Sequence, residues 1–259
     1  MRVLMVGDVV GRPGRDALQQ LLPELRASLA IDRIIVNGEN AAAGRGLTEQ
    51  IARQMLRLGV DVITSGNHIF DVREFVPALD NDWPVLRPAN YPPGTPGRGM
   101  VRIDGLTVIN LMGRTFMPMP LDDPFRVADE LLDQVPADDI VLVDFHAEAT
   151  SEKQAIAWYL DGRVAGVVGT HTHVPTADQR ILPGGTAMCT DLGMCGARDS
   201  IIGDDVNAVL HRFLTSMPTR LPVADGPVAV LNSVLIEIDE QTHRAVSIER
   251  VDRECLVSI

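Results

Sequence analysis

The sequence predicts an α/β protein built from two packed, mixed β-sheets that are flanked by helices. Short runs rich in Val, Ile and Leu alternate along the chain with stretches whose apolar residues recur at helical spacing. This alternation indicates parallel strands covered by helices, and two hairpin patterns add antiparallel strands. With about ten strands expected, two packed sheets are favoured over one open sheet.

The N-terminal half follows the alternating pattern from its first residues. An amphipathic helix is indicated by leucines at the spacing of one helix face, Leu18, Leu21, Leu22, Leu25 and Leu29. The predicted strands are residues 3–7, 34–37 and 60–64, and further helices are predicted at residues 48–58 and 74–79. The Pro-rich residues 85–96 are expected to form an extended strand and a loop.

The C-terminal half continues with strands, helices and two hairpins. Asp104-Gly105 separates two apolar runs and is a strong hairpin signal. The predicted strands are residues 100–103, 107–111, 140–145, 164–168 and 187–192, and the predicted helices are residues 125–135, 152–160 and 206–214. Residues 228–237 and 245–250 are expected to form a closing hairpin. Because no repeat or linker interrupts the chain, we expect residues 1–259 to form a single domain.

The composition excludes several classes of protein. Hydrophobic residues make up 46% of the chain and charged residues 22%, which excludes a disordered tail protein. The longest apolar runs are far shorter than the ~20 residues that a membrane helix needs. Asp8 interrupts the first run before the core of a signal peptide develops. We therefore expect a soluble cytoplasmic protein that does not bind membranes.

The net charge and the cysteines indicate which binding partners and which cellular compartment to expect. The net charge is −12 and no basic stripe stands out, so binding to long nucleic acid is disfavoured. Cys189, Cys195 and Cys255 form an odd set without a CxxC motif, which fits a reducing compartment. Cys189 and Cys195 could share a metal, but thiols in loops or in the core are favoured because the spacing does not match a zinc finger.

Polar side chains follow most of the predicted strands directly or within three residues. They are Asp8, Glu39, Asn67, His146 and His171, and His173 lies two residues beyond the last. The carboxyl ends of parallel strands meet at one crevice, so these side chains are expected to converge there. Histidines, carboxylates and Asn carbonyls together are a ligand set for two metal ions. Each residue alone has an ordinary structural explanation. Taken together, these explanations would require six independent coincidences at strand ends, so the metal-binding interpretation is favoured.

The order of these residues resembles the calcineurin-like metallophosphoesterases, whose pattern is an early Asp, a bridging acid, GNH, a lone His and GHxH. The resemblance is closer still to the bacterial YmdB-like subfamily of 2′,3′-cyclic-nucleotide phosphodiesterases. It is carried by the segments GDVVGRPGR, NGENAAAGRGLT, SGNHIFD, RPANYP, DFHAEATSEK and GTHTHVPTAD. The resemblance covers the chain from residue 1 to about residue 203. The fold that this resemblance implies is a four-layer αββα sandwich.

The resemblance also implies which residues hold two metal ions. One ion would be bound by Asp8, Glu39, Asn40 and His173, and the other by Glu39, Asn67, His146 and His171, with Glu39 bridging. The resemblance points to iron, with manganese as the alternative, and zinc or cobalt also suit nitrogen and oxygen ligands.

The sequence departs from the general superfamily pattern in three places. It lacks the His two residues after Asp8, it has Glu39 where Asp is usual, and its GNH is followed by Ile69, with Asp71 as the nearest acid. The missing His leaves one metal short of a ligand. Asn40 is our candidate for its replacement.

The implied function is a dinuclear metal-dependent phosphodiesterase that converts small 2′,3′-cyclic nucleotides into 3′-nucleotides. A hydroxide bridging the two metals would attack phosphorus in line, and His68 would protonate the departing alkoxide as general acid. The alternative for His68 is a residue that merely holds a metal ligand in place. One or more arginines in the same loops, Arg12, Arg45, Arg87 and Arg114, are candidates for substrate contacts, although for each a solvated loop charge is the favoured interpretation.

Two other functions are weighed against this hypothesis. Gly7, Gly11 and Gly14 follow the first strand and could form a dinucleotide-binding loop, but they lack the GxGxxG spacing and leave the metal ligands unexplained. A non-enzymatic metal-binding regulatory or scaffold protein that retains the phosphoesterase fold is the main alternative. The expected partner is a small phosphodiester, and the sequence leaves a homo-oligomer open.

Overall fold

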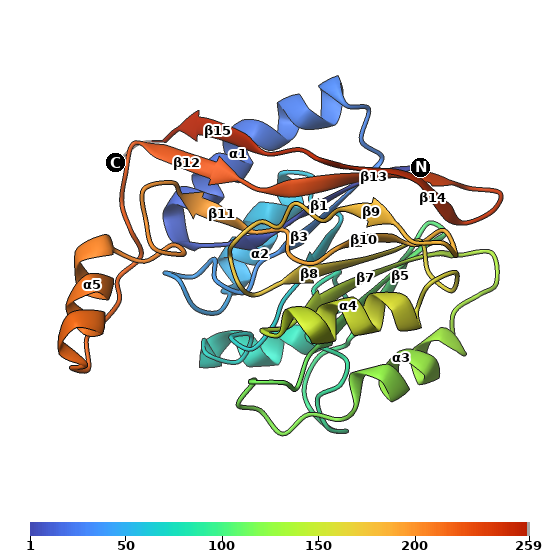
Figure 1. Cartoon of the computed structure of the whole chain (residues 1–259), viewed down its shortest axis with the longest axis horizontal. Helices are drawn as coiled ribbons and strands as arrows, with labels where there is room; N and C mark the ends of the chain where they lie inside the picture. Colours follow the sequence, from blue (N-terminus) through green and yellow to red (C-terminus); the bar gives the residue numbers. More distant parts are fainter. Residues whose placement is uncertain (258–259) are drawn as a thin grey trace.

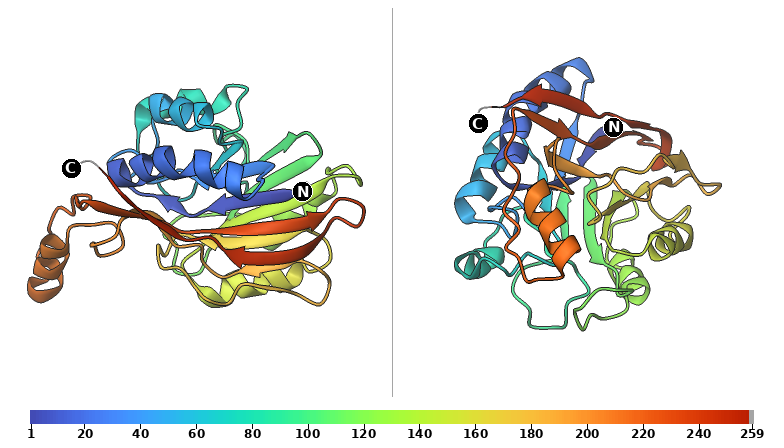
Figure 2. Two further views of the ribbon diagram at one scale, coloured as in Figure 1. Left: turned by 90° about the horizontal axis from the view of Figure 1, so that it is seen from above. Right: turned by 60° about the vertical axis from the view of Figure 1, so that its left-hand side comes forward.

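The computed structural model describes residues 1–257 and shows two large sheets stacked between helices (Figures 1 and 2). The first sheet has the strand order β14-β13-β1-β3-β4, in which β1, β3 and β4 are parallel and β13 and β14 are antiparallel to their neighbours. Its strands are β1 (Arg2–Val6), β3 (Arg33–Asn37), β4 (Val62–Thr64), β13 (Ser233–Asp239) and β14 (Arg244–Arg250). We call it the five-stranded sheet.

The second large sheet has the order β5-β6-β7-β8-β10-β9 and is also mixed. Its strands are β5 (Met100–Ile103), β6 (Leu106–Met112), β7 (Ile140–His146), β8 (Gly166–Thr170), β9 (Arg180–Ile181) and β10 (Ala187–Cys189). The predicted hairpin is confirmed, because β5 and β6 pair antiparallel around Asp104 and Gly105. Both turn residues have positive φ, 45° and 79°, as a type I′ turn requires.

A third, four-stranded sheet was not predicted. Its strands are β2 (Asp8–Val9), β11 (Met194–Ala197), β12 (Val228–Leu231) and β15 (Arg253–Leu256). The single strand predicted at residues 228–237 is wrong, because β12 and β13 are separated at Asn232. The reason is that the two halves of this segment pair in different sheets. β13 pairs directly with β1 in the five-stranded sheet, whereas β12 pairs with β11, which lies between β2 and β12 in the third sheet. Gly7 permits this, since a Cβ there would lie 1.9 Å from the Gly193 carbonyl oxygen.

Helices cover the outer face of each large sheet. On one side lie α1 (Gly11–Ser28), α2 (Glu49–Arg57) and the 3₁₀ helix η1 (Arg73–Asp80), and on the other lie α3 (Pro124–Leu132) and α4 (Thr150–Tyr159). Strand side chains alternate accordingly, since Leu4 and Val6 pack in the cluster that contains α1, whereas Val3 and Met5 pack between the sheets. The predicted four-layer fold class is confirmed, with the small third sheet as an addition.

Helix α1 begins earlier than the leucine spacing shows. It opens at Gly11 rather than near Leu18, so the segment considered as a dinucleotide-binding loop forms its first turn. Gly14 lets this turn touch β11, because a Cβ there would lie 2.1 Å from the Cys195 carbonyl oxygen. Gly7, Gly11 and Gly14 therefore serve close packing, and the dinucleotide-loop alternative has no support in the fold.

Helix α5 (Val206–Thr215) projects away from the layered body (Figure 1). Val209 is its one buried residue, while Phe213 and Leu214 are exposed. None of the helices within residues 1–257 combines the length and the apolar character that a membrane-spanning segment requires.

Candidate metal centre

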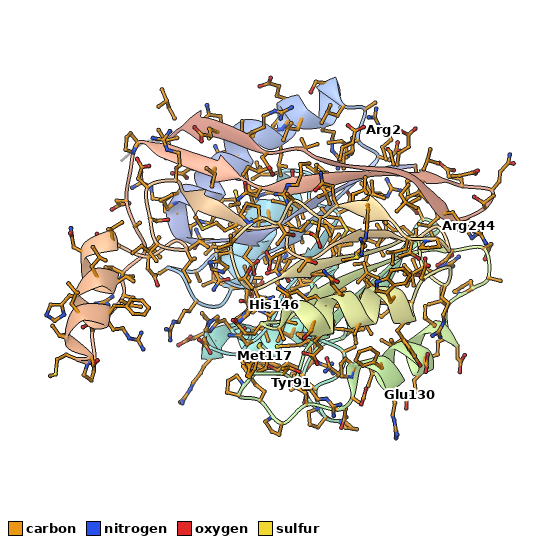
Figure 3. The ribbon with its side chains drawn as sticks, viewed as in Figure 1. Arg2, Tyr91, Met117, Glu130, His146 and Arg244 are labelled. Atoms are coloured by element: carbon orange, nitrogen blue, oxygen red, sulfur yellow. The ribbon has the colours of Figure 1, made fainter. Side chains whose placement is uncertain are left out.

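The predicted ligands lie where the parallel strands of the two large sheets end. Asp8 directly follows β1 and Gly7, Glu39 lies two residues after β3, and Asn67 lies three residues after β4. His146 is the last residue of β7, and His171 is the first residue after β8. The two sheets therefore contribute to one site, with His146 near the centre of the molecule (Figure 3).

Four ligands form a compact group, which we call the inner cluster: Glu39, Asn67, His146 and His171. His146 Nε2 lies 3.1 Å from Glu39 Oε1, 2.9 Å from Asn67 Oδ1 and 3.0 Å from His171 Nδ1. Two ligand atoms at a right angle on a metal with bonds of about 2.1 Å are separated by about 3 Å. The inner cluster therefore has the donor set and the spacing of a metal site.

Gly66 allows the imidazole of His146 to reach this position. A Cβ on Gly66 would lie 2.1 Å from His146 Cδ2 and 2.2 Å from its Nε2. Any other residue at the start of the GNH motif would displace the ring. The glycine of this motif is thus explained by a close approach between the end of β4 and the end of β7.

A buried polar network orients His146. Its Nδ1 lies 2.9 Å from Thr170 Oγ1, and the Thr170 hydroxyl donates to Asp144 over 2.7 Å. Thr64 and Asn37 donate to the other oxygen of Asp144. The Nδ1–H of His146 is therefore the donor to Thr170, which leaves Nε2 as the ring nitrogen that faces the inner cluster.

This network was not predicted, although the sequence contains a signal for it. Asn37, Thr64 and Thr170 are the last residues of β3, β4 and β8, and Asp144 lies two residues before the end of β7. Each is a buried polar residue in an otherwise apolar strand. A buried polar group needs partners, so such residues at the ends of neighbouring parallel strands predict mutual hydrogen bonds.

Three further ligands form what we call the outer cluster: Asp8, Asn40 and His173. Asp8 Oδ1 and Asn40 Oδ1 are buried and have no hydrogen-bond partner among residues 1–257. Each such acceptor destabilises the fold by about 1–3 kcal/mol unless something satisfies it. Asp8 Oδ1 also lies 3.7 Å from His146 Nδ1, so the two clusters adjoin. Two unsatisfied buried oxygens beside the inner cluster fit a second cation.

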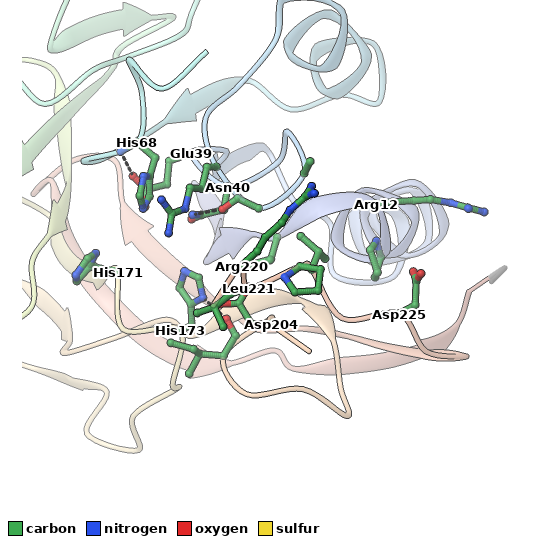
Figure 4. Close-up of a pocket in the computed structure, with 18 of the residues that line it drawn as sticks. Arg12, Glu39, Asn40, His68, His171, His173, Asp204, Arg220, Leu221 and Asp225 are labelled. Atoms are coloured by element: carbon green, nitrogen blue, oxygen red, sulfur yellow. Dashed lines mark hydrogen bonds between the residues drawn. The ribbon is translucent and has the colours of Figure 1, made fainter. Parts of the chain in front are cut away.

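The other atoms of the outer cluster are already engaged, which sets their orientation. Asp8 Oδ2 accepts the His171 backbone N–H at 3.1 Å, and Asn40 Nδ2 donates to the Gly44 carbonyl at 2.9 Å. His173 Nδ1 lies 2.7 Å from the Ile202 carbonyl oxygen (Figure 4), so its Nδ1–H is the donor. The remaining acceptor of the ring is Nε2, the atom with which a histidine in this tautomer binds a metal.

Burial and mutual charge shift the ionisation of these groups. Burial raises the pKa of Asp8 to about 6, although His173 and His146 act against it. Burial alone would also raise the pKa of Glu39 and lower that of His146, but their ion pair outweighs it and shifts both pKa values the opposite way. Burial, together with the charge on His146, lowers the pKa of His171 to about 3. The buried carboxylates make the site attractive to cations.

His68 lies beside the inner cluster, but its side chain pairs with Asp71, whereas that of its neighbour Asn67 contacts His146. Its backbone N–H donates to Glu39 Oε2 at 3.1 Å, and its Nδ1 lies 2.8 Å from Asp71 Oδ2. Asp71 therefore fixes the ring. It lies three residues after His68, whereas the superfamily pattern has a carboxylate immediately after GNH. The His68 side chain is 25% exposed and lines the cavity described next.

A cavity of about 1050 Å³ opens over both clusters. Of the four arginines predicted to contact substrate, Arg12 and Arg45 line it, although Arg12 points away from the histidines (Figure 4). Arg87 instead donates to the carbonyl oxygens of its own loop, and Arg114 pairs with Asp123 at 2.6 Å. These last two are not among the residues that line the cavity.

The sequence analysis did not identify several residues of the cavity wall. They include Arg15, Glu148, Arg212 and Arg220. Glu148 Oε2 lies 3.1 Å from His171 Nε2, on the side of the ring that faces away from the inner cluster. Arg212 lies on α5 and Arg220 on the segment after it. Nothing in their local sequence indicates that this distant segment returns to the site.

The three cysteines are free and buried, and none belongs to the metal-ligand group found within residues 1–257. Cys195 Sγ donates to the Gly14 carbonyl at 3.3 Å, in the contact between β11 and α1. The expectation that the thiols belong to the core is confirmed.

A family model described as YmdB-like protein matches residues 4–251. The chain belongs to the YmdB-like family. Over 256 residues, this YmdB-like protein is 52% identical to the 2′,3′-cyclic-nucleotide 2′-phosphodiesterase of Bacillus subtilis (strain 168), a match that covers 97% of this chain and 96% of the relative. The resemblance inferred from the sequence motifs is confirmed.

Two solved structures share the complete fold. A hypothetical protein from Thermus thermophilus superposes with a TM-score of 0.91 at 47% identity, covering 98% of this chain and 99% of that one. A novel phosphatase from Mycoplasma pneumoniae gives a TM-score of 0.92 at 33% identity, covering 98% and 93%. The YmdB-like family thus includes proteins described as a phosphodiesterase and as a phosphatase, which favours an enzyme over a scaffold.

Proposed function

We propose that this YmdB-like protein is a metal-dependent phosphodiesterase that hydrolyses 2′,3′-cyclic nucleotides to 3′-nucleotides. The observation that carries the proposal is the meeting of the inner cluster, the two unsatisfied oxygens of the outer cluster and His68 at one cavity. The substrate class is supported by the Bacillus subtilis relative at 52% identity.

Two metal ions would be held by the residues of the two clusters. Glu39, Asn67, His146 and His171 would hold one, and Asp8, Asn40 and His173, together with Glu39, would hold the other. The donors are nitrogen and oxygen without thiolate, which suits iron as the first choice, manganese as the alternative, and also zinc or cobalt. When bound, the metal pair supplies the Lewis acidity that activates water and offsets negative charge on the phosphoryl oxygens.

His68 is the proposed general acid. In the reaction, a bond forms between the attacking water oxygen and phosphorus, and the bond from phosphorus to the 2′-oxygen breaks. The leaving oxygen then needs a proton, which His68 can supply because Asp71 accepts from Nδ1 and leaves Nε2 for the substrate. Asn67 cannot take this role, because an amide is not an acid and its oxygen already belongs to the inner cluster.

Arg45 is the most suitable of the predicted arginines for substrate binding. It lines the cavity between Gly44 and Gly46, whose φ values of 91° and 75° mark a tight loop next to Asn40. Arg12 lines the cavity as well, but its side chain is 3.3 Å from Asp16. We propose that Arg87 and Arg114, which lie outside the cavity wall, support loop structure instead.

The arrangement also bears on domain organisation and location. Each large sheet contributes ligands to the inner cluster, so neither sheet holds a complete site, and we propose that the chain acts as one domain. Three free cysteines support a reducing compartment such as the cytoplasm. The net charge of −12 favours a small phosphodiester over a nucleic-acid polymer as the substrate.

The test begins with protein stripped of metal by a chelator and reloaded with Fe²⁺ or Mn²⁺. The substrates are 2′,3′-cyclic AMP, 3′,5′-cyclic AMP and 3′-AMP, and chromatography separates 3′-AMP from 2′-AMP as products. We expect turnover of 2′,3′-cyclic AMP to 3′-AMP that disappears on chelation and returns on reloading. Wild-type turnover in the stripped protein, or preference for the monoester, would contradict the proposal.

A further inference from the structure

A buried ion pair lies directly beneath the loop that carries two of the proposed ligands. Lys153 on α4 is the single lysine of the sequence and is 3% exposed. Its Nζ lies 2.5 Å from Asp191 Oδ2. Its stem packs against Gly169, where a Cβ would lie 2.9 Å from Lys153 Cδ. Because burying two charges is expensive, such a pair is weak evidence for stability and calls for another role.

Asp191 connects the pair to the loop between β8 and β10. Its Oδ2 accepts the backbone N–H of Thr172 at 3.1 Å and the hydroxyl of Thr172 at 2.8 Å. Thr172 is the residue between His171 and His173. The carboxylate of Asp191 thus holds the centre of the segment whose two ends carry one ligand of each cluster.

The two histidines need such an anchor because their backbone is strained. His171 has a φ of 101° and His173 a φ of 65°, both in the region that favours glycine. Such a conformation is unfavourable for a residue with a side chain. The strained turn directs the His171 ring to the inner cluster and the His173 ring to the Ile202 carbonyl beside the outer cluster. Without the anchor, the segment would relax toward ordinary φ values.

Asp191 also connects to Asp8, a second member of the outer cluster. Its Oδ1 accepts the Gly193 backbone N–H at 2.8 Å, and the Gly193 carbonyl accepts the Asp8 backbone N–H at 3.1 Å. The carboxylate of Asp191 is therefore linked to Asp8, His171 and His173 through one intervening residue each, Gly193 for Asp8 and Thr172 for the two histidines. Lys153 balances the charge of this carboxylate through Oδ2, the oxygen that also accepts from Thr172.

We propose that the Lys153–Asp191 pair is a positioning device that holds His171 and His173 apart, so that each imidazole serves a different metal ion. This inference rests on the proposed dinuclear site. Neither residue touches the reacting atoms, and their effect reaches the metals through Thr172 and Gly193.

The test measures Mn²⁺ binding to stripped protein by calorimetric titration, with stoichiometry checked by elemental analysis. Asp191→Asn has a single acceptor oxygen, so it must release either Thr172 or Gly193. Lys153→Met removes the charge that opposes Asp191. We expect both variants to bind Mn²⁺ about 10–100-fold more weakly, the range found when groups that orient ligands are lost. Turnover should recover at saturating Mn²⁺, because every ligand is intact.

Asp139→Asn is the matched control. Asp139 is also a buried carboxylate paired with a basic residue, Arg102 at 2.7 Å, but it lies just before β7, at the opposite end from His146. It should lower the melting temperature without changing Mn²⁺ affinity. Thr172→Val is the variant to use if the buried changes prevent folding, because it removes only one hydroxyl from a half-buried loop residue.

Wild-type Mn²⁺ affinity in folded Asp191→Asn, Lys153→Met and Thr172→Val protein would overturn the positioning role while leaving the phosphodiesterase proposal intact. Failure of the wild-type protein to bind two equivalents of Mn²⁺ would instead overturn the dinuclear site itself. The two outcomes are therefore distinguishable.

Discussion

The inner and outer clusters adjoin but are built by different means. The inner cluster comes from the ends of strands in both large sheets, and its donor atoms already lie about 3 Å from one another. The outer cluster leaves two buried oxygens without partners, and its histidine sits in a strained loop. The sheets thus preform one half of the site, whereas the other half depends on loops and on a cation to satisfy it.

The largest effect is expected from Glu39, the member of the inner cluster that is proposed to bind both metal ions. Glu39→Gln keeps the shape but removes the buried negative charge, so both metals should be lost and turnover should fall to the background rate. Elemental analysis and the cyclic-nucleotide assay measure this. Glu49→Gln, on the exposed face of α2, is the control and should behave as wild type. Retention of one full equivalent of metal would show that Glu39 does not bridge.

A substitution at His68 tests protonation of the leaving group separately from metal binding. His68→Gln should keep both metals and lower kcat for 2′,3′-cyclic AMP by about 10²–10⁴-fold, the usual contribution of a general acid. A nitrophenyl phosphodiester, whose leaving group needs no proton, should lose far less. Equal loss with both substrates, or wild-type turnover of an alkyl ester, would assign His68 to holding a ligand.

A change beneath the inner cluster should separate the two halves. Asp144→Asn weakens the support of Thr170 and thereby of His146, so affinity for the inner metal should fall about 10–100-fold. Asn40→Ala should weaken the outer metal alone. Titration with Mn²⁺ resolves the two steps. If Asn40→Ala weakened both steps equally, the division into two clusters would be incorrect.

The two clusters should also differ in their response to pH. The pKa of His146 is raised to about 9 by Glu39 and Asp8 against the effect of burial, so a metal must displace its proton at pH 7. Inner-site affinity should therefore rise with pH by about tenfold per unit up to that pKa. Asp8 is ionised above about 6, so the outer site should weaken only as pH falls below that value. Calorimetry in buffers of different ionisation enthalpy counts the protons released.

The smallest effect is expected on the rim of the cavity. Arg45→Ala should raise KM for 2′,3′-cyclic AMP by about tenfold, the loss of one charge-assisted hydrogen bond, with little change in kcat. Arg87→Ala should leave KM unchanged and lower the melting temperature, because it frees the loop carbonyls that Arg87 now satisfies. A raised KM in Arg87→Ala would show that the loop itself reaches the substrate.

The meeting of the proposed metal ligands at one site could be predicted because its signal is local. Asp8, Glu39, Asn67, His146 and His171 each follow an apolar run, and parallel strands bring their ends to one edge. Helix α2 was predictable for the same reason, since Thr48 accepts the Ile51 backbone N–H as its N-cap and Gly59 follows its end with a φ of 93°. Short-range patterns of this kind depend on a few neighbouring residues.

The features that no local sequence pattern predicts depend on residues that are far apart in the chain and meet only in the tertiary structure. The insertion of β11 interrupts the closing strand at Asn232, and no local pattern marks that residue because the cause lies in another segment. The same holds for the Lys153–Asp191 pair and for Arg212 and Arg220 at the cavity. Hydrophobic periodicity records which face of an element is buried, whereas a hydrogen bond or ion pair between distant segments exists only after packing has brought them together.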